Sequence, residues 1–343
     1  MIPPLPQISI VMPVFNHADL VIEMMASIRA NTFAEWELIA IDDGSAESDF
    51  QTIMAYAAQD ERIHYQRRNR EPKGAPACRN IGFEMAHGQY VIFWDSDDWV
   101  TPDCLRERFA AIEKHPQLDF MVFPAGVYRS GHMCFEPCSA LFGYPVYADD
   151  VAAFCSRNLP FVVWNNIYRR SSLQAKGVRW DERLLSLQDA AFNMSALVAD
   201  MKYDYASTSA DYAYRLSSSG SISKQIGNVE HYRSNVLATR IAYELVQGRF
   251  GHRYDRQLYL GALYVYVKMA RVCFDDTFAR DLAQCIALYS PSYGRWFALQ
   301  MRVTRLLMHV MPYKLARQLP MAFSLLRRWS IEEIWLPHWH KNV

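Results

Sequence analysis

Apolar, strand-like segments alternate with helical ones through the first third of the chain, and this alternation limits the folds that the chain can adopt. Runs rich in β-branched residues occupy residues 8–14, 37–43, 62–68, 90–95 and 119–125. Segments with helical spacing lie between them, including 17–32 and 77–88, and Gly88 is the expected end of the second of these helices. Apolar strands that alternate with helices predict an α/β, Rossmann-like fold with a mostly parallel sheet that helices cover on both faces.

The rest of the chain has a different pattern. Residues 126–160 read as irregular, and the next segment predicts a helix over 186–201 followed by two short strands. From about residue 227 the chain reads as helical almost to its end, so a helical C-terminal extension is expected. We therefore predict three regions, 1–125, 126–225 and 226–343.

Composition excludes several classes of protein. The 343 residues are 51% hydrophobic, which is enough for a sizeable core, and the net charge of zero gives no indication of a nucleic-acid partner. Seven scattered cysteines indicate reduced thiols and a cytoplasmic protein. His132, Cys134 and Cys138 could be read as a metal knuckle, but a second ligand pair at suitable spacing is missing. Neither a signal peptide nor a membrane span is expected.

Carboxylates follow two of the predicted strands. Asp95, Asp97 and Asp98 come directly after the apolar run 90–94, and Asp42 and Asp43 end the run that begins at residue 37. In open sheets of this kind, ligands bind beyond the carboxyl ends of the strands. Carboxylates spaced i, i+2 suit Mg²⁺ or Mn²⁺ bound to substrate phosphates. The alternative is that both groups are ordinary turns that lead into the next helix.

Two basic residues lie at or near the start of the segment 77–88. Cations and backbone N–H groups at the start of a helix suit phosphate oxygens, which would give Lys73 and Arg79 a role in ligand binding. The alternative is a solvated basic loop. The motifs of dinucleotide dehydrogenases and P-loop NTPases, G-x-G-x-x-G and G-x-x-x-x-G-K-[ST], are absent.

In this order, these motifs resemble those of the family 2 glycosyltransferases of the GT-A fold. The pattern consists of "PVFN" at the end of the first strand, "DDGS" about 30 residues later, "G-x-P-A-C-R-N", and "A-x-G-x-Y-V-I-F-W-D-S-D-D". It covers residues 8 to about 100, and "Y-x-Y-R…S-I-S" extends it to about residue 223. One departure is Pro76, where the family often has Ser.

The resemblance implies a role for each motif. Region 1–125 would be the nucleotide-sugar-binding half of the GT-A domain and region 126–225 the acceptor-binding half. Asp95 and Asp97 would form the D-x-D motif, which binds Mn²⁺ or Mg²⁺ on the donor diphosphate. The nucleotide-sugar donor would be bound by the following residues: Pro13, Phe15, Asp42, Asp43, Arg79 and Asp95.

Similarity to the family also covers the acceptor side. The family has Glu-Asp at the start of a helix there, and this chain has Gln188-Asp189. The resemblance implies that Asp189 is the general base of an inverting transfer. The alternative is that Asp189 is an acid at the start of a helix, favoured by the helix dipole. His231 could supply a third metal ligand, although a lone histidine is more often structural.

These resemblances imply an enzyme that moves a sugar from a nucleoside-diphosphate sugar, expected to be a UDP-sugar, to a glycan or lipid-linked acceptor. The expected setting is the assembly of bacterial surface polysaccharide or lipopolysaccharide, in the cytoplasm at the inner face of the cell membrane. The alternative is a non-catalytic scaffold or nucleotide-binding protein of the same fold, and Gln188 is the feature that hints at it.

The end of the chain is basic. Residues 291–343 hold eight Lys and Arg and two Glu, which gives 8 − 2 = +6. Within 295–311, basic residues and apolar residues recur at helical spacing on different faces. Such a helix can lie in the interface of an anionic membrane, so contact through 291–330 is expected. The alternative is that the apolar face packs on the protein and the arginines face solvent.

Overall fold

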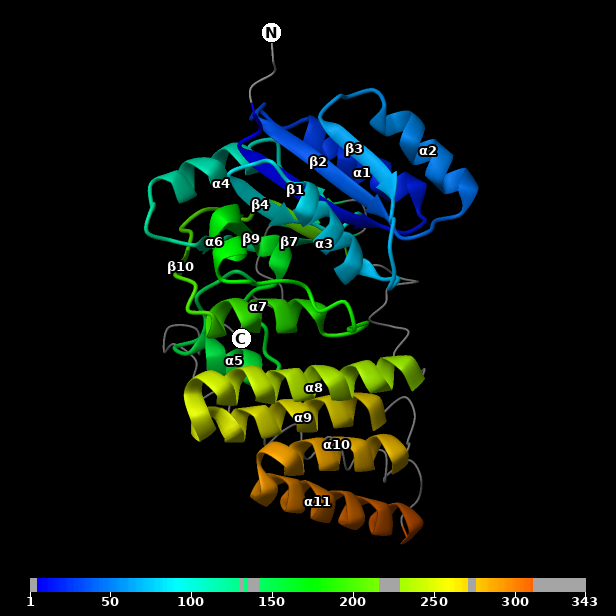
Figure 1. The fold of residues 1–343 in the computed structure, drawn as a ribbon, viewed down its shortest axis with the longest axis vertical. Helices are drawn as coiled ribbons and strands as arrows, with labels where there is room; N and C mark the ends of the chain where they lie inside the picture. Colours follow the sequence, from blue (N-terminus) through cyan, green and yellow to red (C-terminus); the bar gives the residue numbers. More distant parts are fainter. Residues whose placement is uncertain (1–4, 130–131, 135–141, 216–228, 271–275, 311–343) are drawn as a thin grey trace. The chain divides into compact units, whose positions relative to one another are not determined.

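The computed structural model describes residues 5–129, 132–134, 142–215, 229–270 and 276–310. The chain divides into two compact units (Figure 1). The first unit comprises 1–145, 161–183 and 199–218, and the second comprises 146–160, 184–198 and 219–343. The division into three regions made from the sequence remains a prediction.

A seven-stranded sheet forms the core of the first unit (Figure 1). Its strand order is β10-β6-β9-β4-β1-β2-β3. The strands are β1 (Ile8–Val14), β2 (Trp36–Asp42), β3 (Ile63–Arg67), β4 (Tyr90–Phe93), β6 (Phe120–Val122), β9 (Asn166–Arg169) and β10 (Tyr203–Tyr205). β1 pairs in parallel with β2 and β4, and β9 is antiparallel to both of its neighbours. The predicted α/β fold with a mostly parallel sheet is confirmed.

Helices connect these strands, as the sequence predicts. They are α1 (Ala18–Arg29), α2 (Glu47–Ala57), α3 (Ala75–Met85), α4 (Cys104–Glu113) and α6 (Arg170–Ala175). In α1, residues at helical spacing are buried (Val21, Met24, Met25 and Ile28). This apolar stripe explains why the segment forms a helix that packs on the protein.

Gly88 has a different role from the one predicted. α3 ends at Met85, and Ala86 is already extended, so Gly88 does not end the helix. A Cβ on Gly88 would lie 2.6 Å from the backbone nitrogen of Ser9 and 2.8 Å from its Oγ. The Gly88 N–H donates to Ser9 Oγ at 2.8 Å. Glycine is therefore required there because the chain passes close to β1 as it enters β4.

A second, four-stranded sheet has the order β5-β11-β7-β8. Its strands are β5 (Trp99–Val100), β7 (Ala125–Arg129), β8 (His132–Cys134) and β11 (Tyr212–Arg215). The expectation that residues 126–160 are irregular is therefore wrong for β7 and β8, and also for helix α5 (Asp150–Cys155). The proposed knuckle lies partly outside the described residues, because Cys138 is not among them.

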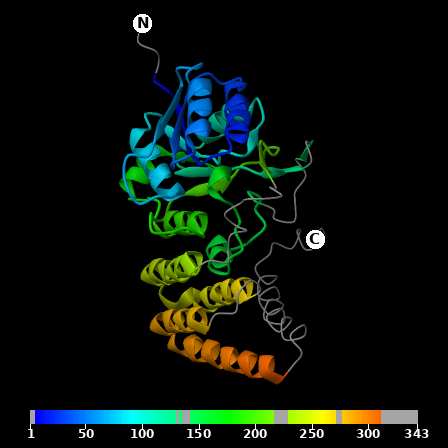
Figure 2. The same cartoon turned by 90° about the vertical axis from the view of Figure 1, so that its right-hand side faces the viewer.

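The second unit is helical. Its helices are α5 (Asp150–Cys155), α7 (Gln188–Val198), α8 (Val229–Phe250), α9 (Asp255–Ala270), α10 (Asp276–Tyr289) and α11 (Pro291–Val310). α8, α9, α10 and α11 lie side by side in Figures 1 and 2, and α10 packs against both α8 and α11. The helical C-terminal region is thus confirmed as far as residue 310. Of the helices described, none is both long enough and apolar enough to span a bilayer.

Candidate active site

The predicted site residues of the first unit lie at one edge of its large sheet. β1, β2 and β4 are parallel neighbours, so their carboxyl ends meet at this edge. The "PVFN" segment ends β1, Asp42 ends β2 with Asp43 directly after it, and the "DSDD" segment follows β4. The topology therefore brings the separate sequence motifs together.

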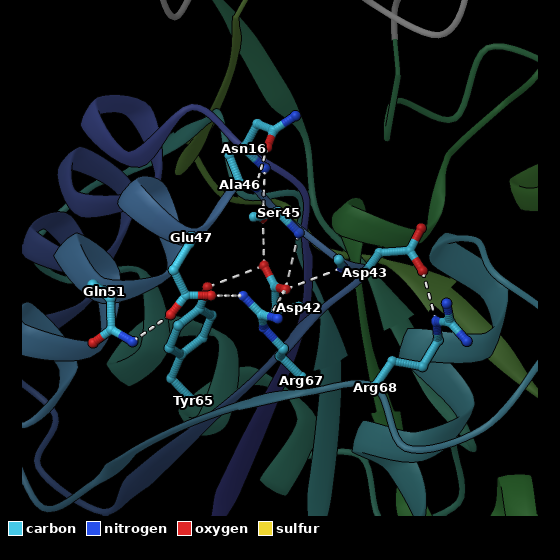
Figure 3. Close-up of polar contacts among 11 residues, drawn as sticks. Asn16, Asp42, Asp43, Ser45, Ala46, Glu47, Gln51, Tyr65, Arg67 and Arg68 are labelled. Atoms are coloured by element: carbon cyan, nitrogen blue, oxygen red, sulfur yellow. Dashed lines mark hydrogen bonds and ion pairs between the residues drawn. The ribbon is translucent and has the colours of Figure 1, made fainter.

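Asp42 builds the turn at the end of β2. It is fully buried, and its Oδ1 accepts hydrogen bonds from the backbone N–H groups of Gly44 and Ser45, both at 3.0 Å (Figure 3). Its Oδ2 accepts from the hydroxyls of Ser45 and Tyr65, the latter at 3.1 Å. Burial, and then the charge of Asp42, raise the pKa of the Tyr65 hydroxyl, which therefore stays a donor. Both oxygens of Asp42 are thus committed to the local structure.

Asp43 is in a different environment. Its Oδ1 accepts from Arg68 Nε at 2.9 Å (Figure 3) and from the backbone N–H of Gly74 at 3.0 Å. Its side chain is partly exposed. Asp43 therefore ties the end of β2 to the loop that leads into α3, and unlike Asp42 it also faces solvent.

The end of β1 is fixed to the same turn. The backbone N–H of Asn16 donates to Ser45 Oγ at 2.7 Å, and Asn16 Oδ1 accepts from the backbone N–H of Ala46 at 2.9 Å. Phe15 lies just before this anchor and is 49% exposed, and Lys73 Nζ lies 4.3 Å from the centroid of its ring. Pro13 is within β1, opposite Ile41. An aromatic ring and a cation are thus presented beside Asn16.

Arg79 joins α3 to the aspartates that follow β4. Its Nη2 lies 2.6 Å from Asp95 Oδ1, and its guanidinium lies 4.4 Å from the centroid of the Trp180 ring. Asn80 holds the backbone of Trp180 on both sides, because its Nδ2 donates to Trp180 O at 3.0 Å and its Oδ1 accepts from Trp180 N at 3.1 Å. Trp180 was not among the site residues predicted from the sequence.

Asp97 and Asp98 differ in their surroundings. Burial, and then the negative charge of Asp95, raise the pKa of Asp97 to about 6. Asp98 is fully buried and accepts hydrogen bonds from the hydroxyl of Tyr212 and, at 2.7 Å, from the backbone N–H of Arg215. Asp98 therefore holds β11, whereas Asp95 and Asp97 form a pair of like charges.

A divalent cation fits this pair. Burial is the larger cause of the raised pKa of Asp97 and the charge of Asp95 is the second, and a cation beside the two carboxylates would favour the ionised form of both. Within the described residues, no group of three or more His, Cys, Asp or Glu is arranged to hold a metal. Mg²⁺ and Mn²⁺ fit a site of this kind, because such hard cations bind one or two carboxylates together with substrate phosphates and water.

Asp189 and His231 belong to the second unit. Asp189 lies in the first turn of α7, and the Gln188 amide donates from Nε2 to Leu185 O at 3.0 Å. Only an amide can make this bond, because a Glu carboxylate would face the carbonyl oxygen without a proton. His231 is buried, and its Nδ1 lies 2.7 Å from Ser186 Oγ.

With this geometry in view, comparison with known proteins identifies the first part of the chain. Residues 9–137 match the model of glycosyl transferase family 2. These residues form a family 2 glycosyltransferase domain.

Curated relatives include "Putative glycosyltransferase EpsH" of Bacillus subtilis, 26% identical over 62% of this chain. Another is "Poly(ribitol-phosphate) beta-N-acetylglucosaminyltransferase TarS" of Staphylococcus aureus, 26% identical over 58%. The matches span 61% and 35% of those proteins.

Solved structures confirm the GT-A fold around this glycosyltransferase domain. The structure of S. aureus TarS 1–349 in complex with UDP-GlcNAc has a TM-score of 0.67 and 17% identity, covering 93% of this chain and 92% of that one. Mannosyltransferase PcManGT from Pyrobaculum calidifontis, in complex with GDP-Man and Mn²⁺, has a TM-score of 0.52 and 14% identity, covering 96% and 88%. At this identity, the likeness shows the fold alone.

Proposed function

We propose that the chain is a glycosyltransferase that moves a sugar from a nucleoside-diphosphate sugar to a hydroxyl group of a glycan or lipid-linked acceptor, with inversion at the anomeric carbon. The observation that carries this proposal is the meeting of Asp43, Arg79, Asp95 and Asp97 at one edge of the sheet of a family 2 glycosyltransferase domain. Carboxylates and a cation at the ends of parallel strands suit a charged nucleotide ligand.

The nucleoside part of the donor would meet Asp43 and Phe15. Asp43 can accept hydrogen bonds from a base N–H or a ribose hydroxyl, and the exposed ring of Phe15 offers a surface for stacking. Pro13 would support Phe15 from β1. Asp42 has no oxygen left for the donor, so we propose that it acts by shaping the turn that carries Asp43.

Asp95 and Asp97 would hold the divalent cation. When bound, such a cation neutralises the negative charge that develops on the diphosphate leaving group. Arg79 fixes the position of Asp95 through their 2.6 Å contact, and the ring of Trp180 holds the guanidinium in turn. Arg79 would therefore organise the diphosphate end of the site and add a positive charge to it.

Asp189 is the proposed general base, which removes the proton of the acceptor hydroxyl as the sugar is transferred. A positioned base of this kind contributes about 10²–10⁴-fold to the rate. The hydrogen bond from Gln188 to Leu185 supports this role, because it fixes the start of α7 and so limits the orientations open to Asp189.

The identities of donor and acceptor are proposed from relatives. TarS is named for N-acetylglucosaminyl transfer to poly(ribitol phosphate), and its structure was solved with UDP-GlcNAc. We propose a UDP-sugar as donor and a bacterial cell-surface polymer or its lipid-linked precursor as acceptor, met at the cytoplasmic face of the membrane. GDP-sugars are the second class to assay, because PcManGT was solved with GDP-Man.

The test is a screen of nucleotide sugars for Mn²⁺-dependent transfer or hydrolysis, combined with NMR of the product's anomeric configuration. Wild type should turn over one class of donor, and Asp97→Asn should abolish both turnover and Mn²⁺-dependent nucleotide binding. Asp204→Asn, an exposed aspartate on β10, is the matched control and should behave as wild type. Near-normal activity of Asp97→Asn, or retention at the anomeric carbon, would contradict the proposal.

A non-catalytic scaffold is the second candidate, because the chain has Gln188 where the family has Glu. It predicts nucleotide binding without turnover for every donor in the screen. The hydrogen bond made by Gln188 favours the enzyme over the scaffold. It explains the glutamine at this position by a local structural role, so that loss of activity is not needed to explain it.

A further inference from the structure

Helix α11 exposes an apolar face. Four of its residues are unusually exposed for their type: Trp296 (54%), Leu299 (49%), Val303 (47%) and Leu306 (67%). Their spacing of three, four and three residues places them in one stripe along the helix, which we call the α11 stripe. Figure 1 labels α11, which is the darker orange of the last two helices in Figures 1 and 2 and lies beside α10.

The opposite side of α11 makes the packing contacts. Phe297 is fully buried, and a Cβ on Gly294 would lie 2.4 Å from the Cα of Ala287 in α10. Gln300 Oε1 accepts a hydrogen bond from the hydroxyl of Tyr259 in α9 at 2.5 Å. The alternative in which the apolar face packs on the protein is therefore wrong for this helix, since its side with Gly294 and Phe297 does so instead.

Charge accompanies the stripe. Residues 291–310 contain no Asp or Glu. Arg295 and Arg302 are both exposed, and each lies four residues before a leucine of the stripe, Leu299 and Leu306. Residues four apart are neighbours on a helix surface, so both arginines border the same edge of the stripe.

We propose that the α11 stripe lies in the interface of an anionic lipid bilayer. Trp296, Leu299, Val303 and Leu306 would enter the boundary between headgroups and acyl chains, and Arg295 and Arg302 would meet lipid phosphates. An apolar helix face that carries Trp and is bordered by arginines, with no acid on the helix, has the composition of an interfacial helix. This inference is independent of the sugar-transfer proposal.

A second copy of the chain fits this face less well. A two-fold dimer through the stripe would bring identical surfaces together, and so would place the Arg295 and Arg302 of both copies beside one another with no acid on either helix to pair with them. An anionic bilayer supplies lipid phosphates that can pair with both arginines. Each Arg near such a surface contributes about 1 kcal/mol, or roughly a fivefold change in partitioning.

The test is flotation of the full-length chain with vesicles of phosphatidylglycerol and phosphatidylcholine, compared with pure phosphatidylcholine. The wild type should bind the anionic vesicles at low salt (about 50 mM) and be released as salt shortens the Debye length. Arg302→Ser should weaken binding about fivefold. Val303→Asp, which puts a charge in the stripe, should weaken it more than about tenfold.

Val229→Asp is the matched control, because Val229 is an equally exposed valine (56%) at the start of α8. It should leave vesicle binding unchanged, and circular dichroism and nucleotide binding should be normal in all variants. Equal binding by wild type and Val303→Asp would overturn the proposal. Failure of the wild type to bind anionic vesicles would also overturn it. If that wild type instead forms a dimer in analytical ultracentrifugation, and Val303→Asp disrupts the dimer, the stripe binds a second copy of the chain.

Discussion

At the scale of single residues, the Asp97 carboxyl has a pKa raised to about 6 by burial and by Asp95. In the unfolded chain it would titrate near 3.9. The folded state therefore holds this proton more tightly, so ionised Asp97 opposes folding above pH 6 and ceases to do so as the pH falls toward 4. Asp97→Asn should raise the free energy of unfolding of the metal-free protein by about 1–3 kcal/mol at pH of about 7.5.

Urea denaturation of wild type and variant, at about pH 7.5 and about pH 4.5, measures this effect. The stabilisation should shrink at the lower pH, where the wild-type carboxyl is already becoming neutral. An equal difference at both pH values would mean that the substitution acts through packing and not through charge.

A second residue-scale prediction concerns Asp189. Asp189→Asn should lower kcat by at least about hundredfold, because an amide cannot accept the proton of the acceptor. The dissociation constant of the donor, measured by calorimetry, should stay within about twofold, since the residue acts on the acceptor. Asp204→Asn is the control, because it neutralises an exposed aspartate on β10 that no proposed step uses, and it should leave kcat unchanged. A matching loss of donor affinity would assign Asp189 to donor binding.

The residues proposed for the site could be chosen from sequence because they sit in local motifs. Asp43, Arg79, Asp95 and Asp97 fall within a few residues of strand or helix ends, where pattern is informative. Trp180 was not predictable, because its contacts with Arg79 and Asn80 join positions about a hundred residues apart. The different environments of Asp42 and Asp43 depend likewise on two residues far away in the sequence, Tyr65 in the middle of β3 and Arg68 directly after it.

At the scale of elements, the approach of β1 to the start of β4 depends on a missing side chain. Gly88→Ala would place a methyl group 2.6 Å from the backbone nitrogen of Ser9. The strands would have to move apart, which we expect to cost about 1–3 kcal/mol. Gly248→Ala is the control, because this glycine lies in α8 with nothing within 4 Å of its added Cβ. It should be stabilising by about 0.5–1 kcal/mol. Chemical denaturation of both variants measures their free energies of unfolding. Opposite signs for the two changes would show that Gly88→Ala acts through crowding against Ser9.

A buried ion pair links α4 to the start of β11. Arg108 donates to Asp211 from Nε at 2.7 Å and from Nη2 at 2.6 Å, and also to Trp164 O at 3.0 Å. Asp211→Ala would leave a buried guanidinium without its partner and should cost about 3–5 kcal/mol. The double variant Arg108→Met, Asp211→Leu should recover most of that loss in urea denaturation. If the double variant is no more stable than Asp211→Ala, the unpaired guanidinium is not the cause of the stability lost in Asp211→Ala.

The elements that sequence patterns predicted are those with long apolar runs, and β1 to β4 are close to the predicted ranges. β10 and β11 fall on the two short strands expected after residue 201, but β9 and the other strands of the second sheet, β5, β7 and β8, were not predicted. These strands are two to five residues long, and β11 pairs with β7 and β5 from roughly a hundred residues away. Such short segments carry too little alternation to reveal a partner, because their pairing is decided by the rest of the fold.

At the scale of the whole molecule, the site residues predicted for the donor all lie in the first unit. A ligand that binds only the folded state stabilises it by about 2.7 kcal/mol at one hundred times its dissociation constant. UDP with Mn²⁺ should therefore slow hydrogen exchange in β1, β2 and β4, and have little effect on α10 and α11. Mass spectrometry of the exchanged peptides measures this. Asp97→Asn should remove the effect, and protection confined to α10 and α11 would place the ligand elsewhere.

The C-terminal helices show the limit of sequence patterns at this scale. The alternation of apolar and basic residues in α11 was predicted correctly, but the pattern could not tell which face meets the protein. Gly294 and Phe297 decide it, because the small residue allows α10 to approach closely and the ring fills the contact. The second half of the predicted membrane segment, 311–330, lies outside the described residues.

The hydrogen bonds of Asp42 have a consequence for the evolution of related chains. In a copy that lost its enzymatic role, this aspartate would still stabilise the fold, because both of its oxygens hold the turn. Asp97 is in the opposite position, since its charge opposes folding and only ligand binding would retain it. Genetic drift in an inactive copy should therefore replace Asp97 early and Asp42 late. A survey that counts the first aspartate of "DDGS" as a mark of activity would include inactive copies, and one that counts Asp97 would exclude them.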